Sequence, residues 1–240
     1  MMRGFSTLFR KEFRGSFNSP IAYIVLAGFL AFTAVWTFVI NDFFAADIAS
    51  LRGYFGIMPI VFVVLVPAIT MRVWAEERRA GTDEILLTLP ADESTLVLAK
   101  YASSLTLVLI AIGLTAFVPI SVRRLGDFER GEILGQYIGL VLLAASGVAV
   151  GQFVSSLARN QISAFLFSSL ILLALTLIGE VPAVVDLPDP IASTLNYISL
   201  DEHYRTFVRG IVDTRDIVFF VGLSALALIL NTRSLVLRKF

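Results

Sequence analysis

Few side chains in this sequence combine the types and spacing that catalysis requires. Glu76 and Glu77 are adjacent beside an apolar segment, an arrangement that an intramembrane zinc protease could use. A catalytic zinc, however, usually needs two or three histidines or an equivalent set of ligands. His203 is the only histidine in the sequence, and Gly81 stands where a further polar side chain would be needed. We therefore expect no metal site and no catalytic residue, with His203 a polar residue on an outer helix.

The composition excludes several other classes of function. The sequence has no cysteine, so it offers no disulfide and no thiol nucleophile. It contains no G-x-x-x-x-G-K-[ST] phosphate loop and so no recognisable ATP site of its own. Lys plus Arg and Asp plus Glu both number 19, which leaves no excess of basic residues for nucleic acid. With 57% hydrophobic and only 16% charged residues, the 240-residue chain is typical of membrane proteins.

Six apolar segments approach the roughly 20 residues that a helix needs to cross a bilayer. They predict an all-α polytopic membrane protein that forms one domain over residues 1–240. An even number of spans places both termini on one side, and that side carries twelve Lys and Arg against seven on the other. The positive-inside rule then predicts cytoplasmic termini. The predicted spans are 21–40, 55–71, 96–120, 133–157, 161–179 and 217–230, of which the second and the last are short.

Residues 1–19 predict an amphipathic helix that lies on the membrane surface. Phenylalanines and Leu8 recur on one side of its helical wheel, and most of the cations lie on the other side. Glu12 falls within the apolar arc, so we expect its carboxylate to meet a cation or a helix end. A secretory signal peptide is the alternative interpretation, but the apolar run that follows is too long for one.

The predicted spans contain almost no ionisable side chains. Lys100, near the start of the third span, is placed to extend its ammonium group to the membrane surface. Ion-coupled carriers normally bury charged groups at membrane depth, because those groups carry the coupled ion. If this chain takes part in transport, we expect the energy to come from another source.

The fourth span contains two pairs of glycines spaced four residues apart, a pattern that lets a neighbouring helix approach closely. We expect these glycines to serve packing within the bundle, and we expect Gln136 and Gln152 to bond across helices. The glycine pairs are Gly135 with Gly139 and Gly147 with Gly151.

The loop over residues 180–216 is predicted to hold short helices on the side opposite the termini. Ser199 and Glu202 form a capping box that starts one helix. Gly210 is placed to end it. A cap at residues 213–214 would then start the last span.

The segment 72–95, between the second and third spans, is unusually polar. The second span can continue as a helix past Trp74 until Gly81, which can adopt the left-handed conformation that stops a helix. Glu76 and Arg79 are spaced to pair on this helical extension.

A second short helix is expected immediately after this stop. Thr82 can cap it, Glu84 lies in its first turn, and Leu86 and Leu87 give it an apolar surface. Three cations and six anions stand in the segment, whereas a helix meeting anionic lipid would carry the opposite charge. Charge alone fits an ordinary solvated loop. The helix stops and the leucines instead favour a docking element for another protein.

Two stretches of this region carry a resemblance to a known family. They are residues 67–72 (PAITMR) and residues 76–88 (EERRAGTDEILLT). Together they resemble the permease subunits of type-2 ABC exporters, and are most similar to the gliding-motility-associated permease branch. Its relatives include the copper-maturation permease of nitrous oxide reductase. Further residues that share the resemblance are Arg10, Lys11, Glu12, Phe13, His203, Tyr204, Phe207 and Arg209.

The resemblance implies an assembly of two permease chains, as a homodimer or a paralogous heterodimer, with two ABC ATPase subunits in a bacterial inner membrane. ATP and Mg²⁺ would be bound by the ATPase, and this chain would hold no cofactor. Spans one and five would form the interface between the permeases. The N-terminal elbow helix and the segment after span two would contact the ATPase. The residues that transmit its motion would be Glu76, Glu77, Arg78, Arg79, Gly81, Thr82 and Glu84.

Two functions therefore remain open from the sequence. The first is a transmembrane permease subunit that moves a lipid-linked or amphiphilic substrate when driven by a separate ATPase. The second is a non-transporting membrane anchor that recruits an ATPase or an assembly partner. Substrate-stimulated ATP hydrolysis would distinguish the two.

Overall fold

The computed structural model describes residues 2–18, 20–41, 50–81, 92–122 and 129–237. All regular structure within these residues is helical, which confirms the expected all-α fold. Six of the helical stretches are long and apolar enough to cross a membrane. They are Pro20–Ile40, Met58–Arg79, Glu93–Val122, Arg130–Leu157, Gln161–Val184 and Thr214–Val236.

The described helices follow one another along the chain in two groups. The first group is α1 (Met2–Phe17), α2 (Pro20–Val35) with a π-helical turn (Trp36–Ile40), α3 (Arg52–Gly56), α4 (Met58–Thr70) and α5 (Arg72–Ala80). The second group is α7 (Glu93–Thr115), α8 (Phe117–Val122), α9 (Arg130–Leu157), α10 (Gln161–Leu177) with a 3₁₀ turn (Ile178–Glu180), α11 (Val181–Val184), α12 (Asp189–Ile198), α13 (Leu200–Val208) and α14 (Thr214–Val236).

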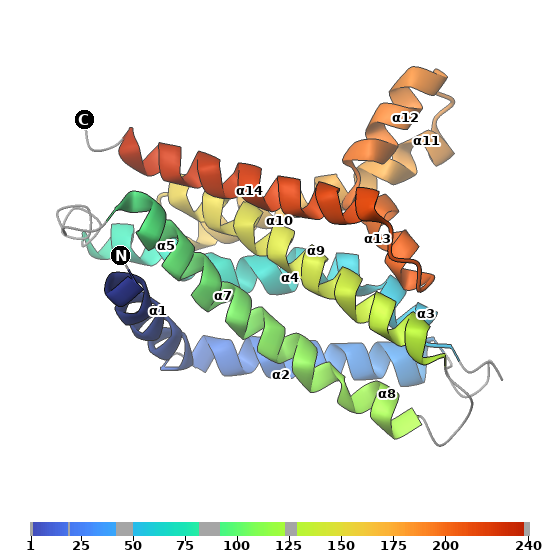
Figure 1. Ribbon diagram of the computed structural model, residues 1–240, viewed down its shortest axis with the longest axis horizontal. Coiled ribbons are helices and arrows are strands. Elements are labelled where there is room, and N and C mark those ends of the chain that lie inside the picture. Colours follow the sequence, from blue (N-terminus) through green and yellow to red (C-terminus); the bar gives the residue numbers. More distant parts are fainter. Residues whose placement is uncertain (1, 19, 42–49, 82–91, 123–128, 238–240) are drawn as a thin grey trace.

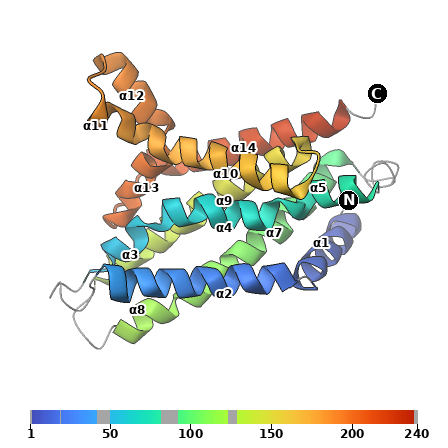
Figure 2. The ribbon, with the colours of Figure 1, turned by 180° about the vertical axis from the view of Figure 1, so that it is seen from behind.

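The helix α9 lies at the centre of the bundle. It packs against α4, α7, α10 and α14, and α5 and α13 contact it near its two ends (Figure 1). The view from behind shows α4 between α2 and α10 (Figure 2). The helices α1 and α5 and the end of α14 lie at one end of the bundle, named here the α5 end (Figure 1). The helices α3, α8 and α13 lie at the opposite end, the α13 end (Figure 1).

The four glycines of α9 lie where other helices come closest to it. A Cβ atom at Gly139 would collide with the Phe207 side chain of α13, and one at Gly151 would collide with Thr70 of α4. Gly135 faces the backbone of Gly210, and Gly147 faces Val66 of α4. Each pair therefore accommodates a different partner, α13 and the chain after it for the first pair and α4 for the second.

Two glutamines of α9 hydrogen-bond to other helices. The Gln136 side chain donates to the Val208 carbonyl oxygen of α13 at 2.9 Å. The Gln152 side chain donates to the Val97 carbonyl oxygen of α7 at 3.0 Å. Both side chains are fully buried, so these bonds give the amide nitrogen of each glutamine a partner inside the bundle. The expectation that they bond across helices is confirmed.

Several span boundaries differ from those expected. The second span starts at Met58 rather than Phe55, because Phe55 belongs to the separate helix α3 and Pro59 suits the first turn of α4. The last span is longer than its apolar run, since the helix α14 continues as far as Val236. This extension of α14 packs on the bundle, where Asn231 and Leu235 are buried.

The helix caps at the α13 end lie where the sequence predicts them, although only one of the two hydrogen bonds of the expected Ser199–Glu202 capping box is present. The Ser199 hydroxyl accepts from the Glu202 amide at 3.3 Å and starts α13. Gly210, with φ of 78°, follows the end of that helix. The Asp213 carboxylate accepts from the Arg215 amide at 2.8 Å and caps α14. The helices α11 and α12 project from this end (Figure 1) and contain no buried side chain in the described chain.

Candidate functional site

The helix α5 extends the second span and is fixed to α9 by one serine. The Ser155 hydroxyl of α9 donates to the Met71 carbonyl oxygen at 3.2 Å. It also accepts from the amides of Trp74 and Ala75 at 3.3 and 3.4 Å. These amides belong to the first turn of α5, where backbone N–H groups lack partners within the helix. The start of α5 is thus attached to the central helix.

A second attachment lies one turn further along α5. The Arg78 guanidinium donates to the carbonyl oxygens of Ser156 and Ala158 at the end of α9. Carbonyl oxygens in the last turn of a helix have no N–H donor within that helix. A cation at this position is also favoured by the helix dipole. The Ser156 hydroxyl in turn contacts the Ser234 hydroxyl of α14 at 3.0 Å.

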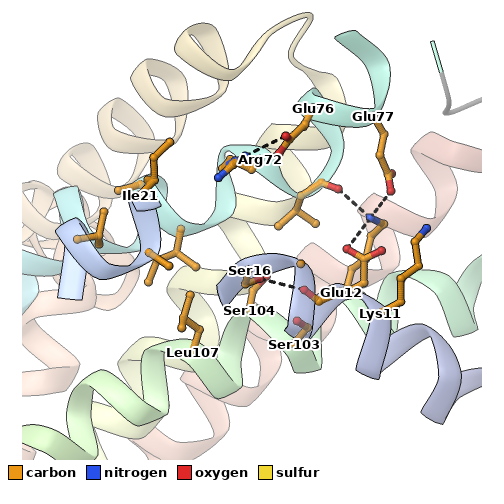
Figure 3. Close-up of a pocket in the computed structure, with 17 residues that line it drawn as sticks. Lys11, Glu12, Ser16, Ile21, Arg72, Glu76, Glu77, Ser103, Ser104 and Leu107 are labelled. Carbon is orange, nitrogen blue, oxygen red and sulfur yellow. Dashed lines mark hydrogen bonds and ion pairs between the residues drawn. The ribbon is translucent and has the colours of Figure 1, made fainter. Parts of the chain in front are cut away.

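A buried cation joins α5 to two further helices. The Lys100 Nζ atom of α7 lies 2.7 Å from Glu77 Oε1 of α5 and 3.1 Å from Glu12 Oε2 of α1 (Figure 3). It also donates to the Val73 carbonyl oxygen at 3.0 Å and lies 4.9 Å from the centre of the Trp74 ring. The Lys100 side chain is only 1% exposed, so its charge depends on these partners. We name Lys100, Glu12 and Glu77 the lysine node.

The lysine node corrects one expectation and confirms another. Lys100 does not extend its ammonium group to the membrane surface, because the group is enclosed by α1, α5 and α7. The expectation that the spans hold almost no buried charge is therefore wrong at this position. Glu12 does meet a cation, as its place within the apolar arc of α1 indicates.

A cavity of about 290 Å³ opens beside the lysine node between α1, α2, α4, α5 and α7 (Figure 3). Its apolar walls include Ile21, Val25 and Leu107. Its charged wall combines three cations with three carboxylates, namely Lys11, Arg72, Lys100, Glu12, Glu76 and Glu77.

Within this wall Glu76 pairs with a different arginine from the one expected. The Arg72 guanidinium donates to both carboxylate oxygens of Glu76, at 2.8 and 2.9 Å. The expected pairing of Glu76 was with Arg79. The observed pair has the i, i+4 spacing, which brings side chains together on one helix face at least as well as i, i+3.

The other predicted site residues at this end are placed as follows. Arg79 is exposed, and Gly81 has φ of 67°, the left-handed conformation expected at the end of α5. Arg10 and Lys11 are exposed on α1, and the Phe13 ring lies between those of Phe9 and Phe17 at 5.7 and 5.0 Å. Thr82, Glu84, Leu86 and Leu87 lie outside the described residues.

A second buried polar cluster lies at the α13 end. The His203 Nδ1 atom lies 2.7 Å from Asp216 Oδ1, and its Nε2 atom lies 2.9 Å from the Tyr197 carbonyl oxygen. The ring stacks on Phe219 with centroids 3.9 Å apart. Both ring nitrogens are therefore in hydrogen-bond contact with oxygen atoms of neighbouring helices. His203 lies on the short helix α13, as expected, and its buried ring connects this helix to α12 and α14.

The remaining outer residues of the resemblance fall into buried and exposed groups. Tyr204 and Phe207 are fully buried, and burial raises the pKa of the Tyr204 hydroxyl well above its usual value. Arg209 is exposed at the end of α13. The sequence signalled the buried face of α13 through its apolar spacing, but gave no sign that Asp216 would pair with His203.

Known families give independent information on this arrangement. Residues 37–200 match the family model of ABC-2 family transporter proteins, and this range includes α3 to α12 with α5 and α9. No curated protein matches the chain. The matched range covers more than half of the chain, and the protein therefore belongs to the ABC-2 transporter family, whose members are membrane permeases of ABC transporters.

Proposed function

We propose that this chain is the membrane half of an ATP-driven exporter and that α1 and α5 carry the motion of its ATPase partner. Family membership supports a permease that works with a separate ABC ATPase. The single observation that carries the proposal is the lysine node, because one buried cation joins the elbow helix, the extension of the second span and the third span.

The route of the motion follows from the attachments of α5. A displacement of α5 would pull on α9 through Ser155 and Arg78 and on α7 through the lysine node. Because helices are stiff along their axes, the movement would reach the bundle rather than be absorbed within α5. The elbow helix would follow, since Glu12 shares the same ammonium group.

The contact with the ATPase is assigned to the exposed side of α5 and to the chain that follows it. Trp74 and Ala75 of α5 are buried against the bundle, whereas Glu76 and Arg79 are exposed. The left-handed Gly81 directs the chain into residues 82–91, whose acidic and leucine-rich sequence suits a protein groove. By this proposal the α5 end is cytoplasmic, which agrees with the positive-inside count.

The proposed assembly contains two permease chains and two ATPase subunits, which bind ATP and Mg²⁺. Spans one and five would form the permease interface. These spans are among the least buried in the described chain, at 17% and 22%. Both flank α4 (Figure 2), whose Ile60 and Val64 are exposed. An apolar face of this kind suits a second copy of the chain or a paralogue.

A lipid-linked or amphiphilic substrate is the class that the bundle suits best. The cavity beside the lysine node places charged groups next to apolar walls formed by Ile21, Val25 and Leu107. A ligand with a polar head and an apolar tail matches both surfaces, whereas a purely hydrophilic solute would leave the apolar walls without a partner.

The test is reconstitution with the ABC ATPase encoded by an adjacent reading frame. The complex would be placed in proteoliposomes, and vanadate-sensitive ATP hydrolysis and complex yield would be measured. We expect Arg79→Glu to lower complex yield at least tenfold, because reversing an interface charge typically costs several kcal/mol. Arg209→Glu, the same reversal at the exposed α13 end, is the matched control and should change neither quantity.

Three outcomes would distinguish the alternatives. Equal yields for Arg79→Glu and the parent chain would remove α5 from the interface. A stable complex whose ATP hydrolysis responds to no amphiphile, and which moves no fluorescent lipid, would favour the membrane anchor. Hydrolysis stimulated by an amphiphile in the parent and lost in Lys100→Met would support the exporter.

A further inference from the structure

A second cavity, distinct from the one beside the lysine node, runs along the outer surface of the bundle. Helices α10 and α14 both pack on α9, and a groove of about 660 Å³ remains between them. This volume lies within the roughly 300–1,000 Å³ of pockets that hold small molecules. Leu157, Phe167 and Leu226 are each more than half exposed along it, so the groove is open at the outer surface of this chain.

The wall of the groove is divided sharply by polarity. Its three polar residues, Arg159, Asn160 and Ser163, gather at the α5 end, where the chain passes from α9 to α10. The remaining lining residues are all apolar and come from α9, α10, α14 and Ala158. Among the described residues that line the groove, Arg159 alone is ionisable, and it is exposed.

The length of the groove matches one leaflet of a bilayer. On α10 it extends from Ser163 to Leu175, twelve positions that correspond to about 18 Å of helix rise. Half of a hydrocarbon core roughly 30 Å thick is about 15 Å. The apolar part of the groove therefore suits one acyl chain that starts at the membrane surface of the α5 end.

The charges near the polar end favour an anionic head group. The carbonyl oxygens of Ser156 and Ala158 already accept hydrogen bonds from Arg78. Their partial negative charge is therefore compensated and does not repel an anion. The carboxylates of Glu76 and Glu77 on the neighbouring α5 are paired with Arg72 and Lys100. Among the described residues, no carboxylate forms an ion pair with Arg159, so its positive charge is available to an anionic group. Basic pockets between membrane helices commonly bind anionic lipid head groups.

We propose that this groove binds an anionic glycerophospholipid, with its phosphate at Arg159 and one acyl chain between α10 and α14. The site is separate from the proposed contact with the ATPase, and lipid binding here requires neither transport nor a partner chain. It gives the exposed Arg159 a ligand and covers apolar surface that the described helices leave open.

The test uses the purified full-length chain in a neutral detergent. Dioleoyl phosphatidylglycerol or dioleoyl phosphatidylcholine would be titrated, and bound lipids would be counted by native mass spectrometry. We expect the parent chain to favour phosphatidylglycerol about fivefold, the effect of one basic side chain near an anionic group. Arg159→Gln should remove that preference, and Ile171→Trp should reduce binding of both lipids by filling the groove.

Arg79→Gln is the matched control, since it removes one exposed arginine at the same end without touching the groove. It should keep the parent preference. The proposal is overturned if the parent binds both lipids equally, if Arg159→Gln keeps the preference, or if Arg79→Gln loses it to the same extent. It is also overturned if lipid adducts vanish whenever the chain dimerises, because the groove is then a contact between copies.

Discussion

Glu12 of α1 and Lys100 of α7 form a 3.1 Å ion pair, although two membrane spans separate them in the sequence. The same ammonium group bonds Glu77 of α5 at 2.7 Å. A carboxylate within the apolar arc of an amphipathic helix would be unfavourable without such a partner. The pair therefore explains the one irregularity in the pattern of α1 and holds that helix against the bundle.

Replacing Lys100 should destabilise the protein more than replacing a surface lysine. In Lys100→Met two partly buried carboxylates lose their common cation, and we expect a loss of about 3 kcal/mol. Thermal unfolding of the detergent-purified chain would measure the change. Lys11→Met, an exposed lysine of the same cavity, is the control. A melting temperature unchanged in Lys100→Met would show that the node contributes nothing to stability.

The glycines of α9 predict a contrast between close and open positions. Gly139→Ala and Gly151→Ala should each cost about 1–3 kcal/mol, because the added Cβ meets Phe207 or Thr70. Gly222→Ala in α14 has no neighbouring atom within 4 Å and should be neutral or stabilising by up to about 1 kcal/mol. Thermal unfolding of the three variants provides the comparison. Equal effects at all three positions would contradict the packing described.

The buried pair at the α13 end can be measured by a double-mutant cycle. His203→Ala leaves the Asp216 carboxylate buried without its partner, so this single change should be strongly destabilising. His203→Ala combined with Asp216→Ala should cost less than the sum, with a difference of about 0.5–3 kcal/mol. Arg209→Ala, exposed on the same helix end, should stay within about 0.5 kcal/mol of the parent. Additive effects would mean that the two side chains do not interact.

The left-handed Gly81 predicts a substitution pattern based on the backbone alone. No atom of the described residues lies within 4 Å of a Cβ added at Gly81, so the backbone conformation is the restriction that the structure shows. Its φ of 67° suits asparagine but costs a β-branched residue about 1–2 kcal/mol. We expect Gly81→Asn to keep ATP hydrolysis of the reconstituted complex and Gly81→Val to lower it. If the valine variant hydrolyses ATP as fast as the asparagine variant, the direction in which the chain leaves α5 is unimportant.

Local features of the fold could be predicted from the sequence because they depend on a few neighbouring residues. The caps at Ser199 and Asp213 and the left-handed Gly81 and Gly210 all follow from short-range chemistry. The six spans follow from length and hydropathy. These signals do not depend on which helices become neighbours.

The contacts of the candidate site could not be predicted in the same way. Lys100, Arg78 and Ser155 find their partners on other helices, and nothing in the spacing of these residues specifies those partners. Lys100 near a span end is equally compatible with an ammonium group in water or in a buried pair. His203 and Asp216 are separated in the chain by a turn, and the sequence does not specify that this turn brings the two side chains together.

The central helix α9 has 28 residues and is therefore about 42 Å long. Near one end it holds α5 through Ser155 and Ser156, and near the other it receives α13 at Gly135 and Gly139. By the proposed mechanism, α9 would carry movement as a rigid body from the α5 end to the α13 end. A displacement of α5 at Arg78 would then tilt or shift α9 and so move α13, which contacts the other end of α9. No further connection between the two ends would be needed.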